Sequence, residues 1–203
     1  MNTLKRKSTQ ERKSEIVDAA FSLSLDVGPG RITTEALAKK IGLSHAAIFR
    51  HFPTKEDIWS AVFETISQKM EQGWSDLELA PSSCKRLHDL VGAQLRLVTA
   101  VPALPSIIFS RELHIKNAGI RNGVLALMKR FHAILSTEIQ AGITRGELRP
   151  DIDSDEAANL VIAALQGTVL RWSIASKRFD LIAEGGKMLA LVIRGLQSHA
   201  QKS

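Results

Sequence analysis

The sequence predicts an all-α protein, and three observations support this fold class. Apolar residues recur at helical spacing along nearly the whole chain, whereas no segment alternates as a half-buried strand would. Hydroxyl or acidic capping residues precede several of these periodic runs, and glycine or proline follows them. With 203 residues and 44% hydrophobic content, the chain is long and apolar enough to bury a core.

Caps and turns place the predicted helices in order. The first covers residues 10–26 and stops at the loop DVGPGR. Thr33 caps a short second helix, which Gly42 ends as a C′ glycine would. Ser44 caps a short third helix, which Pro53 closes. The remaining helices are predicted from Thr54 to about Gln72 and over residues 84–100, 106–114, 118–143, 153–176 and 180–198. The helix over residues 153–176 opens with a capping-box pattern at Asp153 and Glu156.

Positive charge is concentrated at the start of the chain. Residues 1–55 carry 10 Lys and Arg against 5 Asp and Glu, whereas the remaining 148 residues carry 17 against 16. A basic module joined to a nearly neutral body indicates a polyanionic partner for the first part only. The alternative is a solvated basic tail, because Lys5, Arg6 and Lys7 alone supply three of these charges.

The cellular compartment is expected to be the cytoplasm. Cys84 is the single cysteine, so no intrachain disulfide can form and a reducing interior is expected. No apolar run follows the basic residues near the N-terminus, as a secretory signal would require. No uninterrupted apolar stretch approaches the roughly 18 residues that indicate a membrane span, so no membrane association is expected.

The second and third helices, separated by the turn Gly-Leu-Ser, match helix-turn-helix geometry, in which the second helix of the pair enters the DNA major groove. If Ile48 is the inward residue, helical geometry points Ala46 and Arg50 directly away from the core. His45 lies in the first turn, where side chains reach base edges most easily. This outer face carries fewer charges than a fully solvated face would.

Lys55 opposes the dipole of the helix that begins at Thr54, which favours anions there. A helix N-terminus with free N–H groups binds anions, and a lysine beside it adds a point charge. Placed just after a recognition helix, this terminus would bind a DNA phosphate, and Thr33 would do the same at the other helix. The alternative is an exposed lysine that solvent tolerates. The coincidence with the Thr33 cap, the Gly-Leu-Ser turn and the outward Arg50 favours phosphate binding.

The segment RITTEALAKKIGLSHAAIFRHFPTKEDIW resembles the DNA-binding domain of the TetR family of one-component repressors. The resemblance covers about the first quarter of the chain, and the remainder is similar only in its helical organisation. It implies that bases are contacted from the outer face of the third helix and phosphates from its flanks. The DNA-binding residues that the motif and the resemblance imply are Thr33, Thr34, Ser44, His45, Ala46, Phe49, Arg50, His51 and Lys55.

Two departures from the family pattern affect DNA contacts. Phe49 stands where the family usually has tyrosine, so a hydroxyl bond to phosphate is absent. Ala46 and Ala47 replace a common Gly-Thr pair, which removes another hydroxyl. Affinity is therefore expected to depend more on Arg50, Lys55 and the basic arm.

The resemblance implies a DNA-binding domain over residues 1–58 and a ligand-binding and dimerisation domain over residues 59–203. A homodimer through about residues 153–198 is expected, because one short recognition helix makes few contacts and the last two helices have wide apolar stripes. Trp172 and Leu196 lie on stripes that look too apolar to face solvent. The alternative is that these stripes simply pack inward.

A small hydrophobic or amphiphilic effector is the expected ligand of the second domain. Polar or aromatic residues set among apolar stripes there are the candidates, although each taken singly is typical of a surface or satisfied core position. No metal is expected, because Glu112 and His114 are two residues apart and do not share a helix face, and no cofactor motif is present. The candidate ligand-binding residues are His88, Gln94, Phe109, Arg111 and Gln166.

An enzyme is not expected, since the chain lacks a P-loop, a G-x-S-x-G elbow, zinc-site spacing and a G-x-G-x-x-G loop. The main hypothesis is a ligand-responsive repressor that acts as a homodimer on a palindromic operator. The alternative is a TetR-like nucleoid-occlusion protein that controls division and has no small-molecule effector. A helical small-molecule carrier would leave the basic N-terminal segment unexplained.

Overall fold

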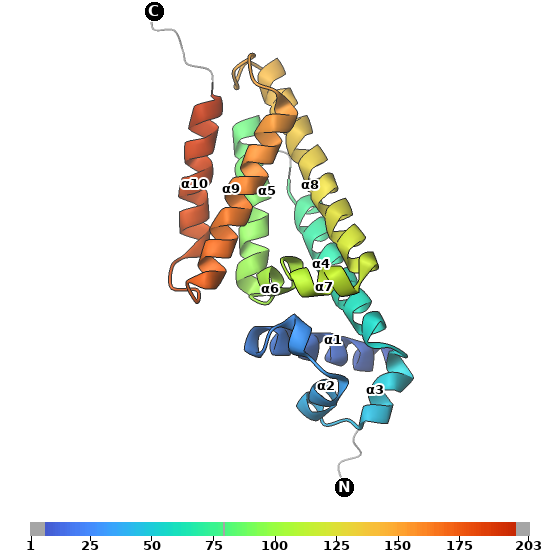
Figure 1. The fold of residues 1–203 in the computed structure, drawn as a ribbon. Helices are drawn as coiled ribbons and strands as arrows, with labels where there is room; N and C mark the ends of the chain where they lie inside the picture. Colours follow the sequence, from blue (N-terminus) through green and yellow to red (C-terminus); the bar gives the residue numbers. More distant parts are fainter. Residues whose placement is uncertain (1–6, 79, 198–203) are drawn as a thin grey trace, which may run out of the picture. The chain divides into compact units, whose positions relative to one another are not determined.

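The computed structural model describes residues 7–78 and 80–197, and it confirms the all-α fold class (Figure 1). Within these residues no strand forms, and the single β-bridge joins Leu148 to Gln197. The elements are α1 Thr9–Asp26, the 3₁₀ turn η1 Pro29–Arg31, α2 Thr34–Ile41, α3 His45–His51, α4 Lys55–Ser75, α5 Ser83–Ala100, α6 Leu104–Ile108, α7 Arg111–Lys116, α8 Ala118–Thr144, α9 Ser154–Ile174 and α10 Leu181–Leu196.

The single helix predicted over residues 106–114 was wrong, because two short helices occupy this region. Pro105 lies in the first turn of α6, where its missing N–H costs little. Ser110 then adopts an extended conformation and its Oγ accepts a hydrogen bond from the Leu113 N–H at 3.2 Å. The serine therefore ends one helix and caps the next.

The capping box predicted at Asp153 is half formed. Asp153 Oδ1 accepts hydrogen bonds from the backbone N–H groups of both Asp155 and Glu156, each at 2.9 Å. No return bond from the Glu156 side chain is found in the described chain. One aspartate satisfies two free N–H groups by itself, so the second half of the motif is unnecessary.

The first of two compact units contains the described residues up to 67 together with residues 101–123. Here α1, α2 and α3 pack on one another, α6 packs on α1, and α7 packs on η1. The core of this unit includes the fully buried side chains of Ile16, Leu37 and Ile48. This compact unit extends beyond the domain limit expected at residue 58 and also includes α6, α7 and the start of α8.

The second unit contains residues 68–100 and the described residues from 124 onward. In it α10 packs on both α5 and α9. Gly185 allows α10 to approach α5 closely, because a Cβ at this position would lie 2.5 Å from Leu95 Cδ1. The core of this unit includes the large, fully buried side chains of Leu87, Leu90, Leu95, Leu135 and Ile139, and Val161 and Leu189 are buried as well.

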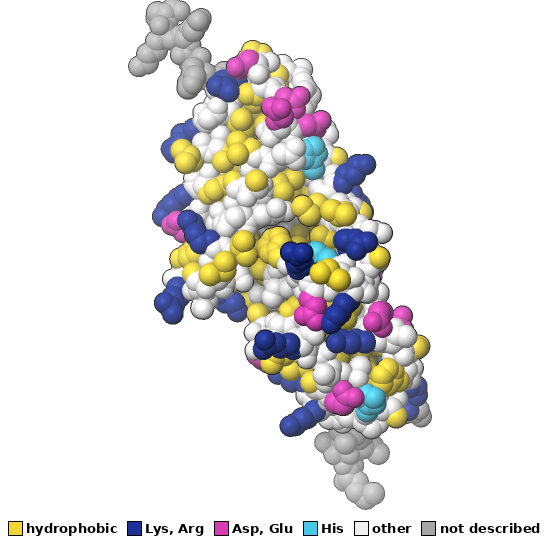
Figure 2. Space-filling view, viewed as in Figure 1, with side chains coloured by type: hydrophobic (Ala, Val, Ile, Leu, Met, Phe, Trp, Pro, Cys, Tyr) yellow, Lys and Arg dark blue, Asp and Glu magenta, His cyan; other side chains and the backbone are white. Residues whose placement is uncertain are grey.

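Trp172 and Leu196, which lie on stripes judged too apolar to face solvent, are buried within the chain itself. Their side chains are 5% and 7% exposed, and Trp172 Nε1 donates a hydrogen bond to the Phe179 carbonyl at 3.1 Å. Both residues belong to the core of the second unit. Other large apolar side chains of the same two helices are exposed, and hydrophobic surface extends over the face along which α9 runs (Figure 2). These residues, named here the α9–α10 apolar face, are Leu160, Leu170, Ile174, Ile182 and Leu191.

By length and composition alone, α9 is apolar enough to cross a bilayer. Its most apolar 18-residue stretch has a mean hydropathy of 1.2, and 39% of that stretch is buried inside the protein. A core helix of a soluble protein passes the same test. Because α9 packs against α5 and α10, its composition is accounted for by helix packing and gives only weak support for a membrane span.

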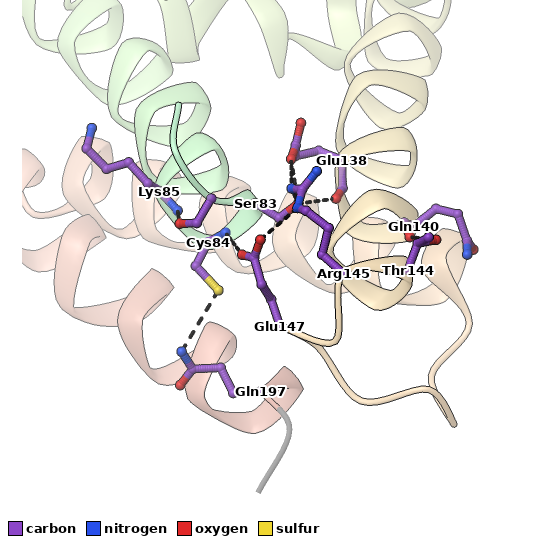
Figure 3. Close-up of polar contacts among 10 residues, drawn as sticks. Ser83, Cys84, Lys85, Glu138, Gln140, Thr144, Arg145, Glu147 and Gln197 are labelled. Carbon is purple, nitrogen blue, oxygen red and sulfur yellow. Dashed lines mark hydrogen bonds and ion pairs between the residues drawn. The ribbon is translucent and has the colours of Figure 1, made fainter. Parts of the chain in front are cut away.

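A polar cluster ties the start of α5 to the end of α8 and the loop that follows it (Figure 3). Glu147 Oε2 accepts from the backbone N–H of Cys84 at 3.3 Å, and its Oε1 accepts from Arg145 Nε at 2.8 Å. Ser83, whose side chain is fully buried, donates to the Glu138 carbonyl at 2.9 Å and accepts from Arg145. The cluster therefore satisfies N–H groups at the first turn of α5.

Glu147→Gln should lower the free energy of unfolding at pH 7 by about 1–2 kcal/mol, because the carboxylate caps α5 and pairs with Arg145. Burial raises the Glu147 pKa, but the hydrogen bonds from Arg145 and the Cys84 backbone outweigh it and leave the pKa below the usual 4.5. Because the Glu147 pKa is lower in the folded chain than in the unfolded chain, the ionised carboxylate stabilises the fold at pH values above the unfolded-state pKa. This stabilisation is lost as the pH falls through the folded-state pKa. The difference between the variant and the parent in urea denaturation should therefore shrink as the pH falls below the usual carboxyl pKa of 4.5.

The matched control is Asp89→Asn, which removes a carboxylate paired with Lys85 along one helix surface and should leave stability nearly unchanged. Equal effects of the two substitutions at pH 7 would contradict a capping role for Glu147.

Candidate nucleic-acid interface

The helix-turn-helix is formed by α2 and α3, as predicted. Thr33 Oγ1 accepts from the Ala36 N–H at 3.1 Å and thereby caps α2. Gly42 has φ 66°, a left-handed conformation that glycine adopts without a Cβ penalty, and it ends α2. Ser44 Oγ accepts from the Ala47 N–H at 3.2 Å and caps α3. Local hydrogen bonds therefore fix both ends of the turn.

The inward and outward faces of α3 are the predicted ones. Ile48 is 0% exposed and Phe52 is 5% exposed, so both anchor the helix to the core of the first unit. Ala46 and Arg50 are exposed on the opposite side. Phe49 is 37% exposed, which is a large apolar area for a surface position. The outward face is therefore free to contact a partner.

His45 is held by α2 in a way that the sequence did not indicate. Its Nε2 lies 2.9 Å from Thr34 Oγ1 and 2.9 Å from Glu35 Oε1. Its ring meets Phe49 edge-on, with the ring centroids 4.7 Å apart and an interplanar angle of 76°. Thr34 is only 9% exposed, so its hydroxyl is directed at His45 more than at solvent.

Residue 55 is the first residue of α4, and the cap before it is reciprocal. Thr54 Oγ1 accepts from the Asp57 N–H at 3.1 Å, while Asp57 Oδ2 accepts from the Thr54 N–H at 2.9 Å. The Asp57 carboxylate thus occupies part of the anion-attracting terminus. Lys55 is half-buried at this point and adds a positive charge beside the helix terminus.

A basic hollow of about 330 Å³ lies between the start of α1 and the third helix. Burial and the neighbouring Arg50, Arg12 and Lys13 lower the pKa of His51, which favours the neutral ring. His51 Nδ1 is buried and has no hydrogen-bond partner among the described residues. The hollow is lined by Lys7, Thr9, Arg12, Leu43, Arg50 and His51.

Sequence reasoning treated Lys7 as part of a tail and did not single out Arg12. Both side chains contact Glu15, and the distance from Arg12 Nη1 to Glu15 Oε2 is 2.8 Å. The charge surplus of residues 1–55 was the available signal, but it does not say which basic residues share a surface with Arg50.

The five candidate ligand residues fall in different parts of the fold. Phe109 and Arg111 belong to the first unit, where both are exposed. His88 and Gln166 lie half-buried on α5 and α9 of the second unit. Gln94 differs from the others, because it is 4% exposed and its Nε2 has no hydrogen-bond partner among the described residues. Among the residues that the structure describes, no group of three His, Cys, Asp or Glu side chains could hold a metal ion.

These features define a class of protein, namely a helix-turn-helix DNA-binding protein with a separate helical body. Residues 16–62 match the family model described as "Bacterial regulatory proteins, tetR family", and residues 62–195 match "YsiA-like protein, C-terminal region". The chain belongs to the TetR family of bacterial regulatory proteins, which are DNA-binding transcriptional regulators. The resemblance inferred from the motif is thereby confirmed.

Relatives and solved structures agree with this assignment. The chain is 24% identical over 193 residues to the fatty acid metabolism regulator protein of Bacillus subtilis (strain 168), covering 95% of this chain and 99% of that protein. It is 27% identical over 161 residues to the nucleoid occlusion factor SlmA of Marinomonas sp. (strain MWYL1), covering 78% and 81%. The crystal structure of the regulator FadR from Bacillus subtilis in complex with stearoyl-CoA has a TM-score of 0.72 at 23% identity, covering 91% and 99%.

Proposed function

We propose that this regulator is a ligand-responsive repressor that binds a palindromic operator as a cytoplasmic homodimer and has no catalytic activity. The observation that carries the proposal is the outward face of α3, which is exposed, lightly charged and flanked by the basic hollow. A helix-turn-helix uses such a face to read base edges while its flanks hold phosphates.

The proposed DNA contacts keep the roles expected from the sequence and add two residues. His45, Ala46 and Arg50 face bases, with Thr34 at the groove edge. Phosphates lie near the helix ends and the basic hollow, where Lys7 and Arg12 join the earlier candidates. The proposed phosphate-side residues are Thr33, Ser44, Phe49, His51, Lys55, Lys7 and Arg12.

Dimerisation is proposed through the α9–α10 apolar face. Ile174 and Leu191 are 75% and 65% exposed, and three further large apolar side chains share the two helices. Large apolar side chains left exposed on neighbouring helices favour a protein interface. Two copies would supply two recognition helices, one for each half of a palindrome, as twofold symmetry requires.

Selection from random DNA should yield a palindromic site whose affinity falls steeply with salt. Each phosphate neutralised contributes about −0.9 to the slope of log affinity against log salt, so a dimer should show a slope of several units. Fluorescence anisotropy between about 50 and 200 mM salt measures it. An operator affinity that does not change with salt concentration, or equal affinity for every sequence, would contradict the proposal.

An effector with an apolar chain and a carbonyl group is proposed for the second unit. Gln94 carries this part of the proposal, because a buried amide N–H without a partner is costly and a ligand carbonyl could accept from it. Leu90, Val91 and Leu95 surround its position on α5 with apolar side chains that are also buried. The similarity to a fatty acid metabolism regulator favours an acyl-CoA as the ligand.

Stearoyl-CoA should release the operator, and operator DNA should weaken stearoyl-CoA binding by the same factor, because coupling between two sites is reciprocal. A coupling of roughly 5- to 150-fold is typical. Gln94→Leu should reduce the release while leaving operator affinity unchanged, whereas Gln140→Leu, at an exposed position on α8, should change neither. Coenzyme A without an acyl chain is the ligand control.

The similarity to SlmA, which covers 78% of this chain, supports the nucleoid-occlusion alternative. In that case the operator complex would persist with every acyl-CoA and would instead capture a division protein. This outcome would replace the effector proposal and retain the DNA-binding one.

A further inference from the structure

The contacts of His45 restrict how the recognition helix can present its first side chain. Its Nε2 is 2.9 Å from Thr34 Oγ1 and from Glu35 Oε1, both on α2, and Phe49 packs against the ring edge-on. The His45 side chain is nevertheless 48% exposed, so part of it remains accessible to a partner. Rotation of the ring is thus restrained although the side chain is only half covered.

The Glu35 carboxylate determines which nitrogen of the His45 ring carries the hydrogen. The backbone N–H of Glu35 at the start of α2 and the Thr33 hydroxyl keep the Glu35 pKa below its usual value, so the group is ionised at neutral pH. An ionised carboxylate only accepts hydrogen bonds, so the Nε2 that faces it must donate. In a neutral imidazole the other nitrogen, Nδ1, is then an acceptor. No hydrogen bond to Nδ1 is found in the described part of the chain.

We propose that Glu35 is a positioning residue that sets the base preference of His45. By holding Nε2–H, it presents Nδ1 to the major groove as an acceptor. An acceptor suits the exocyclic amino group of adenine or cytosine and not the O6 and N7 acceptors of guanine. This inference rests on the proposed function, because it requires α3 to be the recognition helix.

Glu35 lies in the first turn of α2, where a carboxylate also stabilises the helix N-terminus. Its side chain is 69% exposed, so it contributes little to packing, and it places a negative charge on the surface expected to meet DNA. A carboxylate there weakens binding to every sequence through repulsion of phosphates. A gain in specificity at His45 would offset this uniform loss.

Operator preference should be measured at pH 8 for the full-length protein, Glu35→Ala, His45→Ala and the double variant. Glu35→Ala should reduce discrimination at one position in each half-site by about fivefold or more, because the single acceptor contact of His45 is lost. All other positions should be unchanged. In the His45→Ala background, adding Glu35→Ala should cause no further change in preference.

A spectroscopic readout tests the hydrogen placement directly. The ¹⁵N chemical shifts of His45 should show a protonated Nε2 and an unprotonated Nδ1 in the parent, and mixed tautomers in Glu35→Ala. The matched control is Glu56→Gln, which removes the same charge from the first turn of α4 and should strengthen binding to all sequences alike. Circular dichroism should show that all variants remain folded.

Two outcomes would overturn the inference. A change of preference by Glu35→Ala in the His45→Ala background would mean that Glu35 contacts a base itself. A uniform change of affinity, like that of the Glu56→Gln control, would mean that Glu35 acts only through its charge. If the parent selects no operator at all, the proposed function fails, and the ¹⁵N shifts still show whether Glu35 sets the tautomer.

Discussion

Replacing both Leu170 and Ile174 by glutamate should convert the protein into a folded monomer whose operator affinity is lower by about two or more orders of magnitude. The two side chains are 47% and 75% exposed, so glutamates there are solvated in the separate chain and should not disturb its core. In a dimer they would bury four unpaired carboxylates, which is strongly unfavourable. Sedimentation equilibrium measures the first effect, and anisotropy with the selected operator measures the second.

Two further variants show whether the effect is specific to this face. Leu125→Glu changes a leucine of α8 that is 58% exposed, and the protein should remain dimeric. Trp172→Ala should instead lower the free energy of unfolding by about 3–5 kcal/mol, because its ring is buried and its indole N–H is bonded within one chain. Unchanged dimerisation of the Leu170 and Ile174 double variant would show that the chains associate through another surface.

Arg50→Ala and Lys55→Ala should both weaken operator binding, but in different ways. Arg50 is exposed on the face of α3 opposite Ile48, so its loss should relax base choice at one position by about 1–3 kcal/mol. Lys55 begins α4 beside the expected phosphate, so its loss should lower affinity for all sequences alike. The salt slope should also fall by about 0.9 for each lost phosphate contact, and a dimer loses two.

Lys69→Ala is the control for charge alone, since it removes an exposed lysine further along α4. It should leave both the base preference and the salt slope nearly unchanged. A changed base preference in Lys55→Ala together with an unchanged one in Arg50→Ala would reverse the assignment of bases and phosphates. Such a reversal is physically reasonable, because Arg50 also lines the basic hollow with His51.

The sequence by itself determined the features that depend on neighbouring residues. Hydrogen bonds between a capping side chain and an N–H two or three residues away are local, so Thr33, Ser44 and Asp153 marked helix starts correctly. With Ile48 taken as the inward residue, helical geometry likewise placed Ala46 and Arg50 on the outward face of α3. Together these signals predicted the helix-turn-helix and its outward face before any tertiary contact was known.

The polar contacts of the DNA-binding surface depended on packing between helices. The pairing of Glu35 with His45 joins residues ten positions apart on different helices. The basic hollow brings Arg12 of α1 beside Arg50 of α3. Neither arrangement leaves a signal in local spacing, because both follow from how α1, α2 and α3 pack on a shared core.

Only the tertiary structure decided which apolar residues of α9 are inside the chain. Trp172 and Ile174 are two positions apart on a helix whose apolar stripe is wide, yet one is 5% exposed and the other 75%. Periodicity shows that a stripe exists, but a stripe wider than one packing interface can face two partners. Packing of α10 and α5 against α9 takes up part of the stripe, and the part left uncovered forms the surface proposed for the dimer.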